Sequence, residues 1–343
     1  MDIPAQWWSL FQSESLDRLV RQALADSPTL AQARAKLKQA QEEFTAKAAA
    51  TRYPALDADI SVTGQQVNLA AMGLTLIPSP DPFSLFSASV SVTYTLDVFG
   101  GNRRALEGLK AKIDYEGFEL EAARQTLAAN VVNAAIRQAS LRAQIAILQD
   151  LMAAQGRQLA ITEERCRAGG VAELDLQNQR LLLNQTQSKL PPLERQLLQV
   201  NHQLAIYLGR EPAEARIDDL DLNGLHLPTT LPLSLPSSLA RQRPDIRAAE
   251  ALWHQASANV GVATANLFPQ LTVSGNFAAQ ATDAGELLSG INAWSFAANL
   301  MQPVFHGGEL RARKRAAVAA YDDAAAVYRQ TVLQGLQEVA DTL

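Results

Sequence analysis

Several residue types and patterns are scarce in this sequence. Cys166 is the only cysteine among 343 residues, so no disulfide can form within the chain. The four histidines are scattered without metal-ligand spacing, which argues against a zinc site. No apolar run approaches 18 residues, so no transmembrane helix is predicted. With 30 Lys and Arg against 35 Asp and Glu, the formal net charge is −5, which argues against a nucleic-acid-binding surface.

Sequence motifs for chemistry and targeting are also missing. The chain contains no phosphate-binding loop, no nucleophile elbow and no His-Glu-x-x-His pair, and Cys166 has no histidine at a catalytic spacing. We therefore expect no enzyme activity and no cofactor. The N-terminal residues lack the basic and apolar regions of a signal peptide, so the chain is either cytosolic or separated from its signal.

The sequence does contain long heptad repeats between residues 102 and 208. Apolar residues seven apart predict two long helices that pack along their length, joined at residues 167–170 as an antiparallel hairpin. The first helix has the seam Leu106, Ile113, Leu120, Leu127, Ala134, Leu141 and Leu148. The return helix has leucine at the same seven-residue spacing, at Leu176, Leu183, Leu190, Leu197 and Leu204.

Four segments alternate strictly between apolar and polar residues, which predicts β-strands with two different faces. Two strands are expected at about residues 56–66 and 86–96, and two more around 271–277 and 294–300. The apolar positions include Leu56, Ile60, Val62, Phe86, Val90, Val92, Leu271, Val273, Trp294 and Phe296. The polar positions, mostly hydroxyl side chains, include Asp57, Asp59, Ser61, Thr63, Ser87, Ser89, Ser91, Thr93, Thr272 and Ser274.

The second half of the chain repeats the first as helix, strand, strand, helix. The spacing from Pro28 to Pro54 matches that from Pro244 to Pro269 within one residue, and the turn at 303–308 parallels that at 97–101. We divide the chain into a first repeat at residues 1–209, a proline-rich connector at 210–235 and a second repeat at 236–343. We expect the second repeat to be truncated inside its long helix.

These elements suggest a membrane channel. Strands of about ten residues with one apolar and one hydroxyl-rich face fit a transmembrane β-barrel with a wet lumen. Four strands are too few to close a barrel, so other copies of the chain would have to supply the rest. A soluble sandwich is the alternative, and the uninterrupted heptads favour the channel.

Three motifs resemble those of the outer-membrane factor family, the TolC-like channels, in particular its efflux lipoprotein branch. They are the runs at residues 241–250 and 263–269 and the turn at 303–308, and the resemblance extends over essentially the whole chain. It implies a homotrimer in the bacterial outer membrane with a twelve-stranded β-barrel and a long periplasmic α-barrel. It further implies a periplasmic adaptor (membrane fusion) protein and an inner-membrane pump as partners.

The resemblance predicts a passive exit duct of a tripartite efflux system, carrying drugs, toxic compounds or other small molecules. The alternatives are a type I secretion duct and a soluble coiled-coil scaffold. The N-terminal lipid-anchor cysteine of this branch is not found in this sequence. We also expect the second helical hairpin, where the family's constriction mainly lies, to be absent, so that normal gating is not expected.

Candidate functional residues lie at the hairpin turn and on the first strand. The turn Arg167, Ala168, Gly169, Gly170 and Val171 resembles an adaptor-docking tip, although a helix end needs glycine in any case. Glu173 and Asp175 are candidates for lining the aperture, against the alternative that they are simply solvated. Asp57 and Asp59 lie on the expected lumen face and could tune ion preference.

Overall fold

The computed structural model describes residues 6–67, 81–213, 220, 222–226, 242–287, 289 and 291–342. Residues Pro78 and Pro80, most of the connector and the start of the second repeat at 236–241 lie outside these residues. The chain forms two compact units. The first comprises Met1–Leu37 and Gly117–Asp245, and the second comprises Lys38–Glu116 and Ile246–Leu343.

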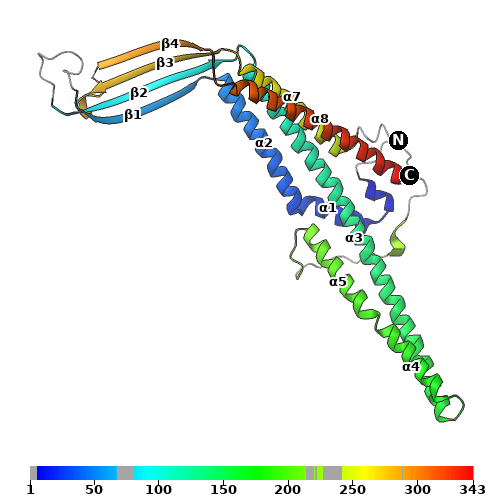
Figure 1. Ribbon diagram of the computed structural model, residues 1–343. Coiled ribbons are helices and arrows are strands. Elements are labelled where there is room, and N and C mark those ends of the chain that lie inside the picture. The colour runs from blue at the N-terminus through cyan, green and yellow to red at the C-terminus, as the bar shows by residue number, and fades with distance from the viewer. Residues whose placement is uncertain are drawn as a thin grey trace, which may run out of the picture. The chain divides into compact units, whose positions relative to one another are not determined.

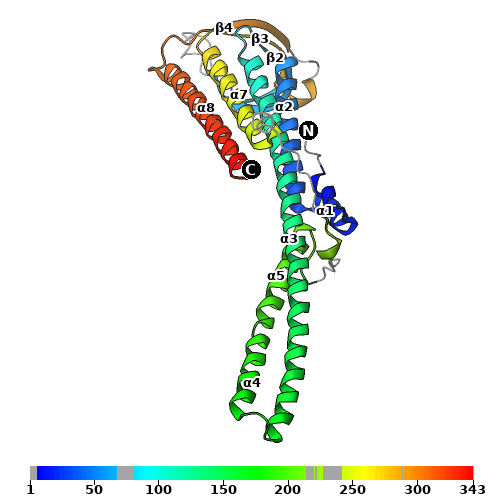
Figure 2. The same ribbon diagram turned by 90° about the vertical axis from the view of Figure 1, so that its right-hand side faces the viewer.

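The first unit is helical. It begins with the 3₁₀ helix η1 (Trp7–Phe11) and α1 (Glu14–Asp26), whose N-cap Ser13 accepts a hydrogen bond from the backbone N–H of Leu16. It continues with the first part of α2 (Pro28–Arg52) and most of α3 (Gly101–Arg167). It also holds α4 (Glu173–Gln187), α5 (Leu190–Tyr207) and η3 (Leu222–Gly224). In Figures 1 and 2, α4 and α5 run back alongside α3, which confirms the predicted antiparallel hairpin.

The core of this unit follows the predicted heptad seam. Leu120, Leu127, Ala134 and Leu141 are all buried and pack in one apolar cluster with residues of α1, α2 and α5. The N-terminal aromatic segment packs on this unit, because Trp8 is buried in the same cluster. Its indole Nε1 donates a hydrogen bond to Asp17 Oδ1 at 3.0 Å, which satisfies the one polar atom of the ring.

The return helix differs from the prediction. It is interrupted at Ser188 and Lys189, so that α4 and α5 are separate helices. The reason is Pro191 and Pro192, which have no N–H to donate to the preceding turn and whose rings would clash with its carbonyls. Proline is tolerated in the first turn of a helix, and α5 accordingly begins at Leu190. The prediction of one continuous return helix was therefore wrong at this point.

The second unit contains the sheet. Its strands are β1 (Ala55–Gln65), β2 (Phe83–Leu96), β3 (Gln270–Ala281) and β4 (Ile291–Met301). They form one antiparallel sheet in the order β1-β2-β3-β4 (Figure 1). The helices of this unit include α7 (Pro244–Ala265) and α8 (Glu309–Thr342), and η4 (Ala284–Glu286) lies between β3 and β4.

Side-chain contacts join the helices of the second unit. Lys112 of α3 forms an ion pair with Glu43 of α2, with 2.8 Å between Nζ and Oε2. This bond, with a second from Gln39, lowers the pKa of Glu43. Trp253 of α7 packs against two tyrosines of α8, with ring centroids 5.6 Å from Tyr328 and 5.8 Å from Tyr321. No described helix combines the length and the apolar character that crossing a membrane would require.

Candidate functional site

The strand register determines which side chains share a face of the sheet. Directly opposite residues of an antiparallel pair lie on the same face. One row across the four strands consists of Ala58, Val90, Phe277 and Trp294, all apolar. The next row consists of Asp57, Ser91, Asn276 and Ser295, all polar. The sheet therefore has one apolar and one polar face.

The other residues singled out in the strands follow the same division. Pairing continues the apolar face through Leu56 with Val92, Val62 with Phe86, and Gly275 with Phe296. Leu271 and Val273 lie opposite Leu96 and Tyr94 on this face. The polar face continues through these pairs: Asp59 with Ser89, Ser61 with Ser87, Thr93 with Ser274, and Thr95 with Thr272.

Much of the apolar face is uncovered. Ile60 and Trp294 each expose 79% of their surface, and Leu56 and Phe296 are also exposed, although Phe86, Leu271 and Val273 are half-buried. A soluble sheet normally packs its apolar face against another layer. In the described part of the chain no such layer covers these side chains, so this face is available to contact lipid or another chain.

The turn from β2 into α3 is fixed by Asp97. Its carboxylate oxygens accept hydrogen bonds from the backbone N–H groups of Asn102 at 3.0 Å and Arg103 at 2.8 Å. These bonds satisfy two donors that the helix start would otherwise leave unpaired. Gly100 has φ +77°, a conformation that glycine adopts without strain. The strand is thereby connected directly to the long helix.

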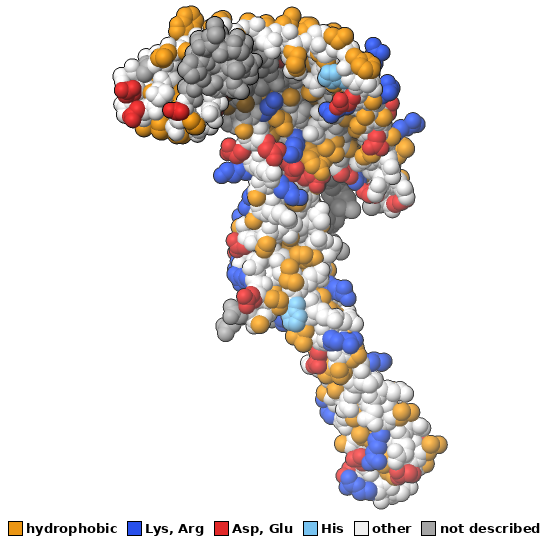
Figure 3. Space-filling view, turned by 60° about the vertical axis from the view of Figure 1, so that its left-hand side comes forward, with side chains coloured by type: hydrophobic (Ala, Val, Ile, Leu, Met, Phe, Trp, Pro, Cys, Tyr) orange, Lys and Arg blue, Asp and Glu red, His pale blue; other side chains and the backbone are white. Residues whose placement is uncertain are grey.

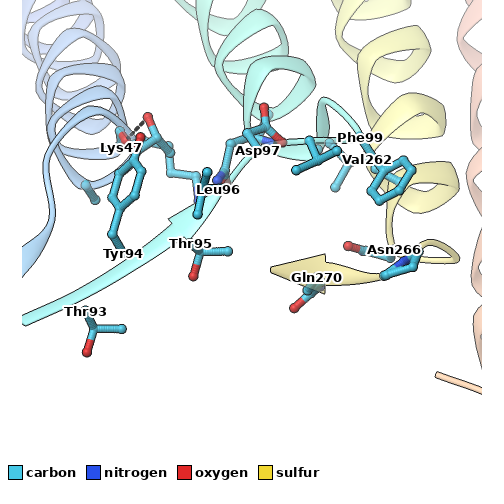
Figure 4. Close-up of a pocket in the computed structure, with 18 of the residues that line it drawn as sticks. Lys47, Thr93, Tyr94, Thr95, Leu96, Asp97, Phe99, Val262, Asn266 and Gln270 are labelled. Atoms are coloured by element: carbon cyan, nitrogen blue, oxygen red, sulfur yellow. Dashed lines mark hydrogen bonds between the residues drawn. The ribbon is translucent and has the colours of Figure 1, made fainter. Parts of the chain in front are cut away.

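A cavity of about 500 Å³ lies beside this turn, where strands and helices meet. Figure 4 shows its labelled side chains, among them Lys47 of α2, Tyr94 of β2 and Asn266 beyond α7. Close by, the rings of Phe99 and Phe268 stack with centroids 4.9 Å apart and planes inclined by 12°. Phe99 precedes α3 and Phe268 precedes β3, so their contact joins the strand-to-helix turn of the first repeat to the helix-to-strand turn of the second.

The hairpin tip is a compact turn between α3 and α4. Gly169 has φ +76°, and the N–H of Gly170 donates to the carbonyl of Arg165 at 2.8 Å, which closes the end of α3. Asp175 Oδ2 accepts a hydrogen bond from the N–H of Ala172 at 3.2 Å and so caps α4. Figure 3 shows side chains of both charges gathered at this end of the hairpin.

Glu173, next to the tip, contacts the only thiol. Cys166 Sγ donates to Glu173 Oε2 at 3.5 Å. Partial burial and, next, the Glu173 carboxylate raise the pKa of this thiol. A raised pKa keeps the thiol protonated, and a protonated thiol is a poor nucleophile. A salt bridge between Arg180 and Glu163, at 2.9 Å, joins α3 and α4 just behind the tip.

One polar pair in the hairpin escaped the sequence analysis. Gln138 of α3 is 1% exposed, and its amide donates to Asn201 Oδ1 of α5 at 2.8 Å. The two residues are far apart in sequence, and no local pattern pairs them. The sequence placed Asp97 only in a turn, because its hydrogen-bond partners lie five and six residues later in the chain. Among the described residues, no three His, Cys, Asp or Glu side chains are arranged to hold a metal ion.

A family model described as "Outer membrane efflux protein" matches residues 19–210 and 235–343. The chain belongs to this family. The pyoverdine export outer membrane protein OpmQ of Pseudomonas aeruginosa is 32% identical over 98% of this chain and 71% of its own length. The outer membrane protein OprJ of the same species is 28% identical over 98% of this chain and 70% of its own length.

Solved structures agree with the family assignment. The outer-membrane channel OprN superposes with a TM-score of 0.87 at 29% identity, over 98% of this chain and 76% of that one. The outer membrane protein VceC of Vibrio cholerae superposes with a TM-score of 0.84 at 26% identity, over 98% and 80%. The chain thus has the fold of these channels and is an outer-membrane component of an efflux system. Its family consists of transport proteins.

Proposed function

We propose that three copies of the chain form a passive exit duct, with the four-stranded sheet as one third of a β-barrel. The observation that supports this most is the exposed apolar face of a sheet whose polar face is rich in hydroxyl groups. Four strands cannot close a barrel, whereas twelve can. Because β1 and β4 run antiparallel to each other, β4 of one copy can pair with β1 of the next without changing the alternation.

The two faces then acquire different roles. In a membrane barrel, apolar strand residues face lipid and the alternate residues face the lumen. We assign the lipid side to Leu56, Ile60, Val62, Phe86, Val90, Val92, Leu271, Val273, Trp294 and Phe296. We assign the lumen to Asp57, Asp59, Ser61, Thr63, Ser87, Ser89, Ser91, Thr93, Thr272 and Ser274.

The hairpin tip is proposed to dock a periplasmic adaptor protein, through Arg167, Ala168, Gly169, Gly170 and Val171. The exposed turn between two long helices supports this, since it offers a short and well-defined protrusion. Glu173 and Asp175 begin α4 directly after it and are our candidates for lining the aperture. An inner-membrane pump would supply the work, because the chain shows no motif for binding a nucleotide.

The names of two relatives indicate a class of transported molecule. One relative is named for pyoverdine export and another, ArpC of Pseudomonas putida, for antibiotic efflux. We propose small organic molecules as the solutes of this duct. A lumen lined by hydroxyl groups provides hydrogen bonds without a closed pocket, which suits a conduit that releases what it admits.

The test is conductance in a planar lipid bilayer. The detergent-solubilised protein should insert and give discrete current steps of one size. A chain that stays monomeric and soluble without detergent, and never conducts, would instead be the coiled-coil scaffold, and the duct would be excluded. Ser91→Arg, which places a positive charge in the proposed lumen, should lower the current carried by cations.

A further inference from the structure

The start of α8 carries an unusual density of positive charge. Between residues 309 and 315 there are one acidic and four basic side chains, Glu309 against Arg311, Arg313, Lys314 and Arg315. Arg313 forms an ion pair with Glu309. For the other three, no acidic partner is found in the described part of the chain. Their spacing of three and four residues places Arg311, Lys314 and Arg315 on one side of the helix.

This placement is unfavourable within the chain itself. The N-terminal end of a helix carries a partial positive charge, so basic side chains are disfavoured in its first turn. Arg311 and Arg315, four residues apart, also repel each other. Arg103 also lies in the first turn of a helix, α3, which follows the other strand pair, although there the Asp97 carboxylate of the same chain caps the helix start. In α8 the acidic side chain of the first turn is paired with Arg313, so the other three basic side chains favour a compensating anion from outside the chain.

Apolar side chains stand directly before this basic cluster. Val304 and Phe305 link β4 to α8 and expose 91% and 84% of their surfaces. Val98 is exposed in the equivalent turn before α3. Exposed aromatic and aliphatic residues next to Lys and Arg are typical of the boundary between the hydrocarbon and the headgroups of a membrane. A soluble anion such as free phosphate would give no reason for the apolar part of this arrangement.

We propose that Arg103, Arg311, Lys314 and Arg315 bind the headgroups of anionic phospholipids in the periplasmic leaflet of the outer membrane, while Val304 and Phe305 contact the acyl chains. The proposal rests on the proposed barrel, whose strands would end at this leaflet where the helices begin. The helix rise places Arg315 about 9 Å beyond Glu309. The headgroup layer is about 5–8 Å thick on each side. Long basic side chains can extend back to it.

The test is native mass spectrometry of the detergent-solubilised assembly, titrated with dimyristoyl phosphatidylglycerol or with the neutral dimyristoyl phosphatidylcholine. The triple variant R311Q/K314Q/R315Q should bind phosphatidylglycerol at least tenfold more weakly, since each basic side chain near a membrane surface contributes about fivefold. Its affinity for phosphatidylcholine should not change. The lysine variant R311K/R315K should bind phosphatidylglycerol as the unchanged protein does, because both retain the charge.

A matched control separates a local site from net charge. R137Q/R157Q/R165Q removes three exposed positive charges from α3 and should leave phosphatidylglycerol affinity within about twofold. If the triple α8 variant does not assemble, the single variant R311Q decides, with an expected loss of about fivefold. Bilayer conductance and assembly mass, measured on the same samples, test the proposed duct independently of lipid binding.

Several results would overturn the proposal. One is equal affinity of the unchanged protein for the two lipids, and another is unchanged phosphatidylglycerol affinity in the triple variant. Binding of inorganic phosphate as tightly as phosphatidylglycerol would show that the acyl chains contribute nothing. Loss of adaptor binding in the triple variant, with lipid affinity intact, would assign the cluster to a protein partner instead.

Discussion

An arginine at Val90 tests the assignment of the two sheet faces. Val90 is near the middle of β2, which extends from Phe83 to Leu96, and it lies between Ala58 and Phe277 on the apolar face. Its side chain is 43% exposed, so arginine would fit without displacing a packed core. In a barrel this residue would be close to the bilayer midplane. A charge there costs about 2–4 kcal/mol.

The neighbouring residue provides the matched control. Ser91 lies between Asp57 and Asn276 on the polar face. Arginine at this position would face water in the proposed lumen, and the Asp57 carboxylate is an adjacent partner for it. We therefore expect Ser91→Arg to change the free energy of assembly by less than about 1 kcal/mol.

The assay is refolding of each variant from urea into phospholipid vesicles, with the assembled fraction measured against urea concentration. Val90→Arg should shift the midpoint to lower urea by the equivalent of about 2–4 kcal/mol, while Ser91→Arg should stay near the unchanged protein. Equal effects of the two arginines would refute the facing. A larger effect at Ser91 would reverse it and place the hydroxyl-rich face against lipid.

Three further predictions concern the helices. Gln138→Leu should destabilise the hairpin by about 1–3 kcal/mol in chemical denaturation, because it leaves Asn201 without its buried partner, and a second change, Asn201→Leu, should restore most of that loss. Gly209→Ala should lower the thermal midpoint, because the glycine has φ +67° and an added Cβ would lie 2.5 Å from the carbonyl oxygen of Asp26; an unchanged midpoint would contradict the geometry. Glu173→Gln should lower the raised pKa of the Cys166 thiol and so speed its alkylation at pH 8 by about twofold to fivefold. Part of the increase in pKa should remain, because partial burial of the thiol is unchanged. Slower alkylation of the variant would contradict this prediction.

The sheet could be predicted well from the sequence because its information is local. Alternation at every second residue determined the strands and their faces. In the middle of the sheet the register then pairs polar with polar residues and apolar with apolar ones, whereas mixed pairs such as Thr63 with Leu85 and Gln280 with Ile291 occur towards the strand ends. The strand ends were less predictable. β2 begins at Phe83, three residues before the predicted start, since hydrogen bonding to β1 extends the strand beyond the strictly alternating part.

The helical hairpin shows where such reasoning failed. The leucine seam from Leu176 to Leu204 predicted one continuous helix, and the periodicity outweighed the proline pair at Pro191 and Pro192, which interrupts it. Residue pairs that join distant segments, such as Gln138 with Asn201, depend on the tertiary structure and left no local pattern to find. The roles proposed for Glu173, Asp175 and the tip residues remain predictions, because they depend on partners outside this chain.

The mass of the assembly in detergent tests the central claim most directly. Analytical ultracentrifugation with the bound detergent matched in density measures the protein mass alone. A ring of three sheets predicts a single species with three times the 37.1 kDa mass of one chain. A stable monomer that needs no detergent, its apolar sheet face shielded from water, would contradict the proposed barrel.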